Sequence, residues 1–551
     1  MFKLGESAVR CLLVRPEFLE NTFYNPREVF QLLGGCSAAP PLGLLTVAAH
    51  LPKHWELKFV DGDVEPITDA HLDWAQVLMI TVMGTQELPI RQLIERAHAR
   101  SVPVVVGGAG PALQPGLFKM ADYVMAGEAE LALPSLIEDI KAGVSKGTYR
   151  GDGMVDLTDA PLPRYDMARL DKYLFVGLCG TRGCPFDCEF CAQIEIFGRK
   201  PRCKPAARII DEHQVLFDLG YRGQIDFGFD NLIGDPHQME ETLTAMREWN
   251  RSHGYPFFYS TEATMNLAKL PKILALMRDN DFRYVFMGIE SGDEAVLNLA
   301  HKGVNTSMPP EEAVRIVNSY GIVVNTGIIL GFDGESDTTA AKVLAMVQKT
   351  GTFPTLVLPL HALPNTQLAK RMAREGRLFK SGVIQNQNDD RTDTATTGLN
   401  FVTQRPRTEI LRDLAHVLEQ LYLPANHFAR TKLAIKQLNT AHKFFPPPMK
   451  ALRLLRAVLR IVGMLGFDRK TAPHFWPSFF RALVTNPGSL EMVVGLGAMN
   501  ANYAKQSKSY VKALREQIAE VERVGEHAFN VSMGATGVIE ANVYSGPTTD
   551  G

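Results

Sequence analysis

Three cysteines stand close together in the segment GTRGCPFDCEFC, residues 180–191: Cys184, Cys188 and Cys191. Thiolates four and three residues apart can reach one compact metal centre from a single tight loop, and thiolates are the usual ligands of iron–sulfur clusters. A cubane [4Fe-4S] cluster has four iron corners, so three cysteines leave one iron open to a small chelating ligand. We therefore expect a metal centre that could bind a reactant as well as carry electrons.

A zinc site is the alternative for the same loop. Cys179 or Cys203 would then supply the fourth ligand of a tetrahedral ion, which tolerates similar spacings. The chain has no paired Cys-x2-Cys motifs with matching histidines, which argues against this alternative. Cys179 and Cys11 are expected to be small buried hydrophobic residues. The sequence assigns no role to Cys36 or Cys203.

The composition is that of a globular protein. The 551 residues, 46% hydrophobic and 21% charged, exclude collagen-like, coiled-coil and wholly disordered classes, and they suffice for roughly two to four domains. A net charge of −2 gives no general electrostatic reason to bind nucleic acid, so no such partner is expected. No secretory signal is visible, and no apolar run reaches the ~18 residues of a membrane span. We expect a cytoplasmic location, where cysteines indicate metal or redox chemistry rather than disulfides.

The N-terminal part of the chain alternates short apolar runs with helix-like segments. Runs flanked by glycine and polar turns favour buried parallel strands with helical crossovers. Residues 1–150 are therefore predicted to form a five-stranded, doubly wound (Rossmann-like) α/β domain, whose ligand would lie beyond the carboxyl ends of the strands. The candidate residues there are Asp61, Gly62, Asp63, Gly84, Gly107 and Gly108. Alternatively, the glycines only form tight turns.

A second strand–helix series follows a linker predicted at residues 151–173, where prolines and alternating charges interrupt the pattern. Six apolar runs in residues 174–365 favour a full or partial parallel βα barrel, with its chemistry at the carboxyl ends of the strands. The polar residues that stand at such ends are Asp230, Asn231, Glu262 and Glu290. Each carboxylate could instead cap the helix that follows it.

Residues 366–551 are predicted to form a mostly helical C-terminal domain with a flexible tail. Within it, residues 450–465 place Arg453, Arg456 and Arg460 on one helix face, with leucines and valines over the remainder. This pattern fits a basic, apolar surface that binds a membrane or an apolar substrate. It fits an ordinary packed helix with solvated arginines equally well.

The spacing Cys-x3-Cys-x2-Cys, with Phe190 directly before the third cysteine and a βα barrel around it, resembles the radical S-adenosylmethionine (SAM) enzymes. The resemblance implies that the three cysteines bind a [4Fe-4S] cluster whose free iron binds SAM, and that Phe190 lies near the adenine. In that family the reduced cluster cleaves SAM to a 5′-deoxyadenosyl radical. By the same resemblance, the four polar strand-end residues named above form the SAM pocket, with Glu262 at the ribose.

A doubly wound domain before such a barrel is the layout of cobalamin-binding radical SAM enzymes. The chain resembles the subfamily that includes the hopanoid C-2 methylase, through segments such as PPLGLLTVAAHLP, TGLNFVTQRPR and YLPANHFAR. Cobalamin is thus implied as a third cofactor, beside the strand-end residues of the first domain. Many cobalamin domains bind cobalt through the histidine of Asp-x-His-x-x-Gly, which this chain lacks, and residues 15–41 contain no histidine. The lower face of cobalamin is expected to be empty, or covered by water or another side chain.

The implied function is methylation of an unactivated carbon of a small-molecule or lipid substrate. One SAM would supply the radical, and methylcobalamin, renewed from a second SAM, would supply the methyl group. Both donors would meet in the cleft between the domains, and an electron donor such as flavodoxin or ferredoxin would be needed. Two alternatives stay open: a radical SAM enzyme that catalyses cyclisation, coupling or rearrangement, and a non-catalytic iron–sulfur or zinc protein.

Overall fold

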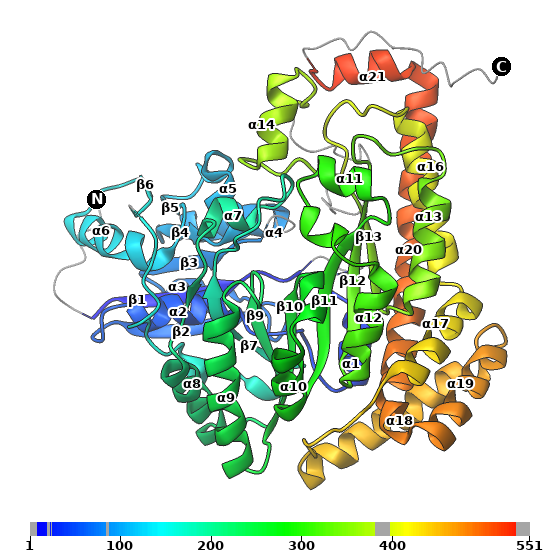
Figure 1. Ribbon diagram of the computed structural model, residues 1–551. Coiled ribbons are helices and arrows are strands. Elements are labelled where there is room, and N and C mark those ends of the chain that lie inside the picture. Colours follow the sequence, from blue (N-terminus) through cyan, green and yellow to red (C-terminus); the bar gives the residue numbers. More distant parts are fainter. Residues whose placement is uncertain are drawn as a thin grey trace.

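Two sheets and a group of long helices build the protein (Figure 1). The computed structural model describes residues 8–18, 23, 25–83, 87–151, 153–380 and 397–535, the side chains of residues 87, 88 and 229 excepted. The predicted candidate Gly84 lies outside the described residues.

The first sheet has the order β2-β1-β3-β4-β5-β6, and all of its neighbouring strands are parallel. Side chains alternate between its faces: Cys11 and Leu13 join the apolar cluster on one face, and Leu12 and Val14 join the cluster on the other. The predicted doubly wound domain is thus confirmed. Its strands are β1 (Arg10–Arg15), β2 (Glu56–Asp61), β3 (Val77–Thr81), β4 (Val104–Gly107), β5 (Tyr123–Met125) and β6 (Gly147–Tyr149), and its helices are α2 (Leu42–His50), α3 (Asp69–Trp74), α4 (Glu87–His98), α5 (Ala109–Leu113) and α6 (Ala129–Ala142).

The prediction of five strands was one too few. The sixth, β6, pairs with β5 at the edge of the sheet. Its three residues, Gly-Thr-Tyr, hold a single large apolar side chain, and so short a run gives no periodic signal.

The second sheet has the order β13-β12-β11-β10-β9-β7-β8. Six of its strands are parallel, and only the short β8 runs antiparallel to β7. Since β8 and β13 stand at opposite ends of this order, the described strands form a partial rather than a closed barrel. Its strands are β7 (Phe175–Arg182), β8 (Arg202–Cys203), β9 (Gly223–Phe229), β10 (Phe257–Ala263), β11 (Phe282–Glu290), β12 (Val323–Leu330) and β13 (Thr355–Pro359). Its helices are α7 (Gln193–Phe197), α8 (Ala206–Asp218), α9 (Pro236–Ser252), α10 (Pro271–Asp279), α11 (Glu294–Leu299), α12 (Pro310–Ser319) and α13 (Thr339–Thr350).

Helices make up most of the described part of the C-terminal domain, as predicted, and residues 536–551 of the predicted flexible tail lie outside the described residues. The longest, α20, packs along α16 beside the second sheet (Figure 1). Among the described residues, no helix combines the length and the apolar character needed to cross a membrane. The helices are α14 (Gln367–Arg374), α16 (Arg407–Leu421), α17 (Pro424–Gln437), α18 (Pro448–Phe467), α19 (Ala472–Thr485), α20 (Leu490–Val524) and α21 (Glu526–Ser532).

Strand β7 meets the carboxyl ends of two strands of the first sheet. Asp61, the last residue of β2, accepts a 2.6 Å hydrogen bond from the hydroxyl of Tyr173, just before β7. At the other end of β7, Arg182 forms an ion pair with Glu128, which follows β5. The ligand-binding edge expected for the first domain therefore faces the second sheet.

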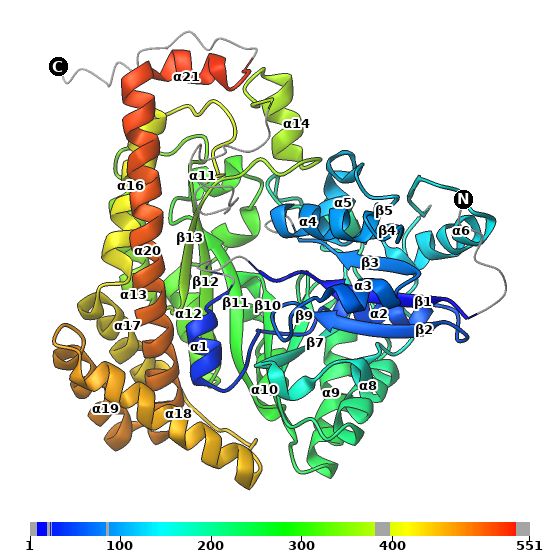
Figure 2. The same cartoon turned by 180° about the vertical axis from the view of Figure 1, so that it is seen from behind.

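The connection between β1 and α2 crosses to the C-terminal helices. Its helix α1 (Arg27–Leu32) lies beside α18 and α20 (Figure 2). The amide of Phe23 donates a 3.1 Å hydrogen bond to the hydroxyl of Tyr510, and the Phe23 ring packs edge-on against Tyr503 at 5.2 Å. The described residues of this connection, 16–18, 23 and 25–41, tie the first domain to the last long helix, and we call them the N-terminal clasp.

Candidate functional site

The three cysteines lie on the loop that leaves the end of β7. Cys188 is buried, Cys184 and Cys191 are half-buried, and all three are free thiols. Gly183 turns the chain into the loop with φ of 90°, and a Cβ there would stand 2.6 Å from the carbonyl oxygen of Lys200. Only glycine fits this turn, since both the positive φ and the close backbone approach exclude a side chain.

Asp230, at the end of β9, holds the start of the same loop. Its carboxylate accepts a 2.6 Å hydrogen bond from the amide of Gly183. Burial raises the pKa of Asp230 to about 6, although this hydrogen bond favours the ionised form. The predicted cofactor residue thus positions the cysteine loop, and a cofactor contact for it stays a prediction.

Glu189, between the second cysteine and Phe190, anchors the middle of the loop. Its carboxylate accepts two hydrogen bonds, of 2.8 and 2.9 Å, from the guanidinium of Arg371 in α14. Arg371 also pairs with Asp333, which Arg377 holds from the other side at 2.7 Å. Bidentate arginine–carboxylate pairs fix orientation as well as charge, so this network sets the position of the loop.

Arg371→Met is expected to loosen the loop, because it leaves the buried Glu189 carboxylate without its partner. Breaking a largely buried pair costs about 3 kcal/mol. Iron content after anaerobic reconstitution and the apparent melting temperature should both fall.

The control for this variant is Arg199→Met. Arg199 is exposed and stands 3.8 Å from Asp187 of the same loop, and such surface pairs contribute roughly 0–1 kcal/mol. Equal losses in the two variants would contradict a positioning role for Arg371.

Lys302 is a buried cation beside the loop that the sequence did not suggest. Lys302 follows α11. Its Nζ lies 3.2 Å from Glu290 Oε1 and 5.7 Å from the centre of the Phe190 ring. Burial opposes its charge, yet Glu290 and the nearby thiols outweigh this, and the pKa of Lys302 is raised. Burial raises the pKa of Cys188 to about 11, and Lys302 acts in the opposite direction. Lys302 therefore favours thiolates in this loop.

The other predicted strand-end residues of the second sheet, Asn231, Glu262 and Glu290, stand at the carboxyl ends of the neighbouring strands β9, β10 and β11. Asn231 is buried, its oxygen accepts a 3.2 Å hydrogen bond from the amide of Thr264, and its Nδ2 has no hydrogen-bond partner among the described residues. Glu262 is half-buried in β10, and its carbonyl accepts from the amide of Leu232. Glu290 ends β11 with φ of 67°, a strained value for a residue with a side chain.

Two of the predicted residues of the first domain have partners inside the protein. Asp61 and Asp63 both pair with Arg15, at 2.6 and 3.2 Å, and Asp63 also binds the amide of Phe18 and the hydroxyl of Ser37. Their carboxylates hold together the strand ends, and cobalamin contacts for them stay predictions. Gly62 approaches the backbone of residue 17 so closely that a Cβ would lie 2.6 Å from its nitrogen.

The glycines after β4 differ from one another. Gly108 has φ of 108° and precedes α5, and a Cβ there would meet the carbonyl oxygen of Val82 at 2.7 Å. Gly107 has ordinary space, with Met125 at 3.5 Å. The turn therefore requires glycine at position 108, in agreement with the alternative that the glycines only form tight turns. The turn does not require glycine at position 107.

Four charged residues join the two sheets next to the cysteine loop. Arg182 pairs with Glu128 and Glu130, both at 2.6 Å, and Arg202 pairs with Glu128 at 2.9 Å. Both carboxylates belong to the turn and helix that follow β5, and both arginines flank the cysteine loop. The first domain is thus held against the loop by buried ion pairs.

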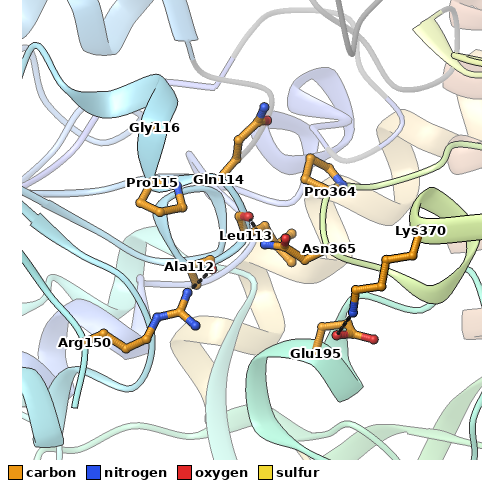
Figure 3. A pocket seen from close by; sticks show the side chains of 10 residues that line it. All are labelled: Ala112, Leu113, Gln114, Pro115, Gly116, Arg150, Glu195, Pro364, Asn365 and Lys370. Carbon is orange, nitrogen blue, oxygen red and sulfur yellow. Dashed lines mark hydrogen bonds and ion pairs between the residues drawn. The ribbon is translucent and has the colours of Figure 1, made fainter. Parts of the chain in front are cut away.

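A cavity of about 640 Å³ lies between the two α/β parts (Figure 3). On one side it is lined by residues 112–116, which follow β4, and on the other by Glu195 of α7 and Lys370 of α14. Lys370 and Glu195 form a 3.0 Å ion pair, and the Asn365 amide donates to the carbonyl of Leu113 across the gap. The size lies within the range of small-molecule sites, roughly 300–1,000 Å³.

Models of known families match three consecutive parts of the chain. The B12 binding domain matches residues 37–137, the Radical SAM superfamily matches residues 178–347, and a domain of unknown function (DUF4070) matches residues 366–516. An uncharacterised methyltransferase of Synechocystis is 34% identical over 93% of this chain and 94% of its own length. The hopanoid C-2 methylase of Rhodopseudomonas palustris is 31% identical over 87% of this chain and 90% of its own length. The chain belongs to the cobalamin-binding radical SAM family.

This radical SAM protein is an enzyme, and the fold agrees with a solved structure of the same kind. The cobalamin-dependent SAM radical enzyme OxsB, solved with aqua-cobalamin, superposes with a TM-score of 0.59 at 15% identity, covering 96% of this chain and 83% of OxsB. At that identity the comparison supports the fold alone.

The residues of the loop fit the cluster of this family. Three free cysteines match the donor set of a [4Fe-4S] cube with one open iron, and the buried Lys302 favours their thiolate form. Within the described ranges, no three Cys, His, Asp or Glu side chains stand close enough to hold a single metal ion. The unpartnered Nδ2 of Asn231 offers a donor to a polar group such as those of SAM.

The remaining cysteines lie outside the loop. Cys11 is fully buried, as predicted. Cys179, which was also predicted to be buried, is only half-buried in β7. Cys203 is half-buried in β8, where its backbone pairs with Thr181. Cys36 is half-buried before α2, and its amide donates to the carbonyl of Lys172.

Proposed function

We propose that this enzyme methylates an unactivated carbon of a small-molecule or lipid substrate, with Cys184, Cys188 and Cys191 as the ligands of its cluster. The observation that carries the proposal is the cavity between residues 112–116 of the B12-binding domain and two residues of the rest of the chain, Glu195 on α7 just after the cysteine loop and Lys370 on α14. Supporting it, two relatives that span nearly the whole chain are named as methyltransferases.

The chain's own residues would position the reactants. When bound, the cluster and SAM supply a hydrogen-abstracting radical, and cobalamin supplies a methyl group. Lys302, Asp230 and Glu189 hold the cysteine loop in one place. The Glu128 pairs with Arg182 and Arg202 hold the two domains at a fixed separation, and a reaction between groups held by two domains requires such fixed positions.

Product mass tests the proposal directly. The anaerobically reconstituted enzyme, supplied with SAM, cobalamin and a strong reductant, is expected to form 5′-deoxyadenosine and a product heavier by one CH2 unit. Extracts of deletion and complemented strains supply the candidate substrates. A product that has lost hydrogen, or has an unchanged mass, would contradict methyl transfer and favour cyclisation, coupling or rearrangement.

Gly116→Phe tests the cavity as the substrate site. Gly116 lines the cavity, and a Cβ there meets no atom within 4 Å, so a phenylalanine can enter the open space without a clash. Methylation is expected to fall roughly 10- to 100-fold, because the substrate can no longer reach its reactive position. Cleavage of SAM without substrate should be unchanged.

Gly43→Phe is the matched control. Gly43 is exposed in α2 and also has open space around its Cβ position, but it does not line the cavity. If Gly116→Phe methylates as fast as the control, the substrate binds elsewhere.

The proposal includes two partners. A small redox protein of the flavodoxin or ferredoxin kind would reduce the cluster. If the substrate is a lipid, a membrane is its source.

A further inference from the structure

Exposed apolar side chains gather in one part of the C-terminal domain. Of the nineteen large apolar side chains that are exposed among the described residues, eleven lie in residues 445–484, which cover α18 and α19. The other eight are scattered singly along the chain. Single exposed leucines are ordinary, whereas a cluster of this kind marks an interaction surface.

Helix α18 separates its faces sharply. Ala457, Ile461 and Leu465 are buried on the inner side. On the outer side, Leu455 is 54% exposed and Leu459 63%. These outer leucines cover no other part of the described chain, although a packed helix would bury them.

The turn from α18 to α19 continues the apolar surface. Phe467, the last residue of α18, is 87% exposed. Trp476 donates a 3.0 Å hydrogen bond to the carbonyl of Gly466, and its ring stacks on Phe480, with centroids 5.6 Å apart. Two exposed aromatic side chains, Phe467 and Phe480, thus stand at the end of the leucine strip. Both helices lie at the outer edge of the molecule in the two opposite views (Figures 1 and 2).

Cations flank this apolar strip. The exposed basic residues are Arg453, Arg456, Arg460, Arg469, Lys470 and Arg481. Residues 441–489 contain a single acidic residue, Asp468, whose carboxylate accepts from the amides of Lys470 and Thr471. Among the described residues, no carboxylate forms an ion pair with the three arginines of α18. The surface is therefore both apolar and strongly positive.

We propose that this α18–α19 surface docks the enzyme on an anionic bilayer. Leucine and phenylalanine side chains would enter the boundary between headgroups and acyl chains, and arginines would reach the phosphates while their stems stay in apolar surroundings. The positive charge favours a bilayer over a second copy of the chain as the partner of this surface. In a dimer through this surface, two cationic faces would repel each other. The inference does not depend on which substrate is methylated.

Vesicle sedimentation tests the docking. The full-length enzyme is mixed with sucrose-loaded vesicles of phosphatidylcholine with 30 mol% phosphatidylglycerol, or of phosphatidylcholine alone. We expect binding to the anionic vesicles that weakens as salt is raised, and much weaker binding to the neutral ones. The triple variant R453Q/R456Q/R460Q should bind roughly 100-fold more weakly, since each arginine near an anionic surface contributes about fivefold.

Two further variants separate charge from apolar contact. R453K/R456K/R460K keeps the charges and should keep most of the binding. L455S/L459S should lose binding, whereas L219S/L299S, which changes two exposed leucines outside the surface, should not. All substituted residues are exposed, and unchanged melting temperatures would show that the fold is intact.

Several results would overturn the proposal. It fails if the enzyme does not bind anionic vesicles at low salt, or if the glutamine triple variant binds as well as the natural chain. It also fails if sedimentation velocity shows a dimer that L455S/L459S dissociates, because a second copy would then cover the surface.

Discussion

Replacement of Cys184, Cys188 or Cys191 by alanine is expected to abolish 5′-deoxyadenosine formation completely. A cube held by two thiolates exposes a second iron and decays, so the iron content of reconstituted enzyme should drop from about four per chain toward zero. Iron and sulfide analysis and the absorption of the cluster measure this loss. The spectrum of the natural enzyme should change when SAM is added.

Cys203→Ala and Cys179→Ala are the matched controls for the loop cysteines. Both residues are free thiols near the loop, and both would be candidates for the fourth ligand of a zinc ion. We expect each variant to retain its cluster and its activity. A purified natural protein that holds zinc, and loses it in the Cys203→Ala variant, would contradict the iron–sulfur assignment.

Among the variants predicted here, Lys302→Met is expected to have the second largest effect, a loss of both protein stability and bound cluster. The variant keeps the length of the side chain but leaves the buried Glu290 carboxylate, 3.2 Å away, without a counterion. Loss of one partner of a buried pair costs roughly 3–5 kcal/mol. In a domain of this size, such a loss lowers the apparent melting temperature by roughly 10 °C. The three thiols also lose the buried cation that favours their thiolate form, so the cluster should be retained poorly.

The double variant Lys302→Met/Glu290→Gln separates these two effects. Replacing both charges removes the unpaired carboxylate, and the melting temperature should recover most of its loss. Cluster retention should not recover, because the thiolates still lack a cation. A single variant as stable as the double variant would show that Lys302 and Glu290 are not coupled.

The sequence predicted the parts of the site that depend on local spacing. The cysteine loop is one continuous segment, so its residue types and intervals carry the signal. The strands that end at Asp230 and Glu290 are recognisable from their apolar runs. Parallel strands place such ends at a common edge, which is why both residues lie on the side of the cysteine loop, where Asp230 binds the amide of Gly183 and Glu290 pairs with Lys302.

The contacts that fix the loop could not be predicted in the same way. Glu189 and its partner Arg371 are 182 residues apart, and glutamates and arginines are common in any sequence. Lys302 is near Glu290 only because the chain turns back after the short helix α11. Asp61 and Asp63 stay predicted ligand contacts, but the sequence did not show that Arg15, at the end of the neighbouring strand, pairs with both.

The N-terminal clasp has a consequence for the order of folding. Phe23 and Tyr510 are 487 positions apart, so the first crossover of the first domain cannot reach its final place until nearly the whole chain has been synthesised. Contacts of such long separation form late. A nascent chain would therefore hold a B12-binding domain with a loose first loop, and a truncation before α20 would leave that loop loose permanently.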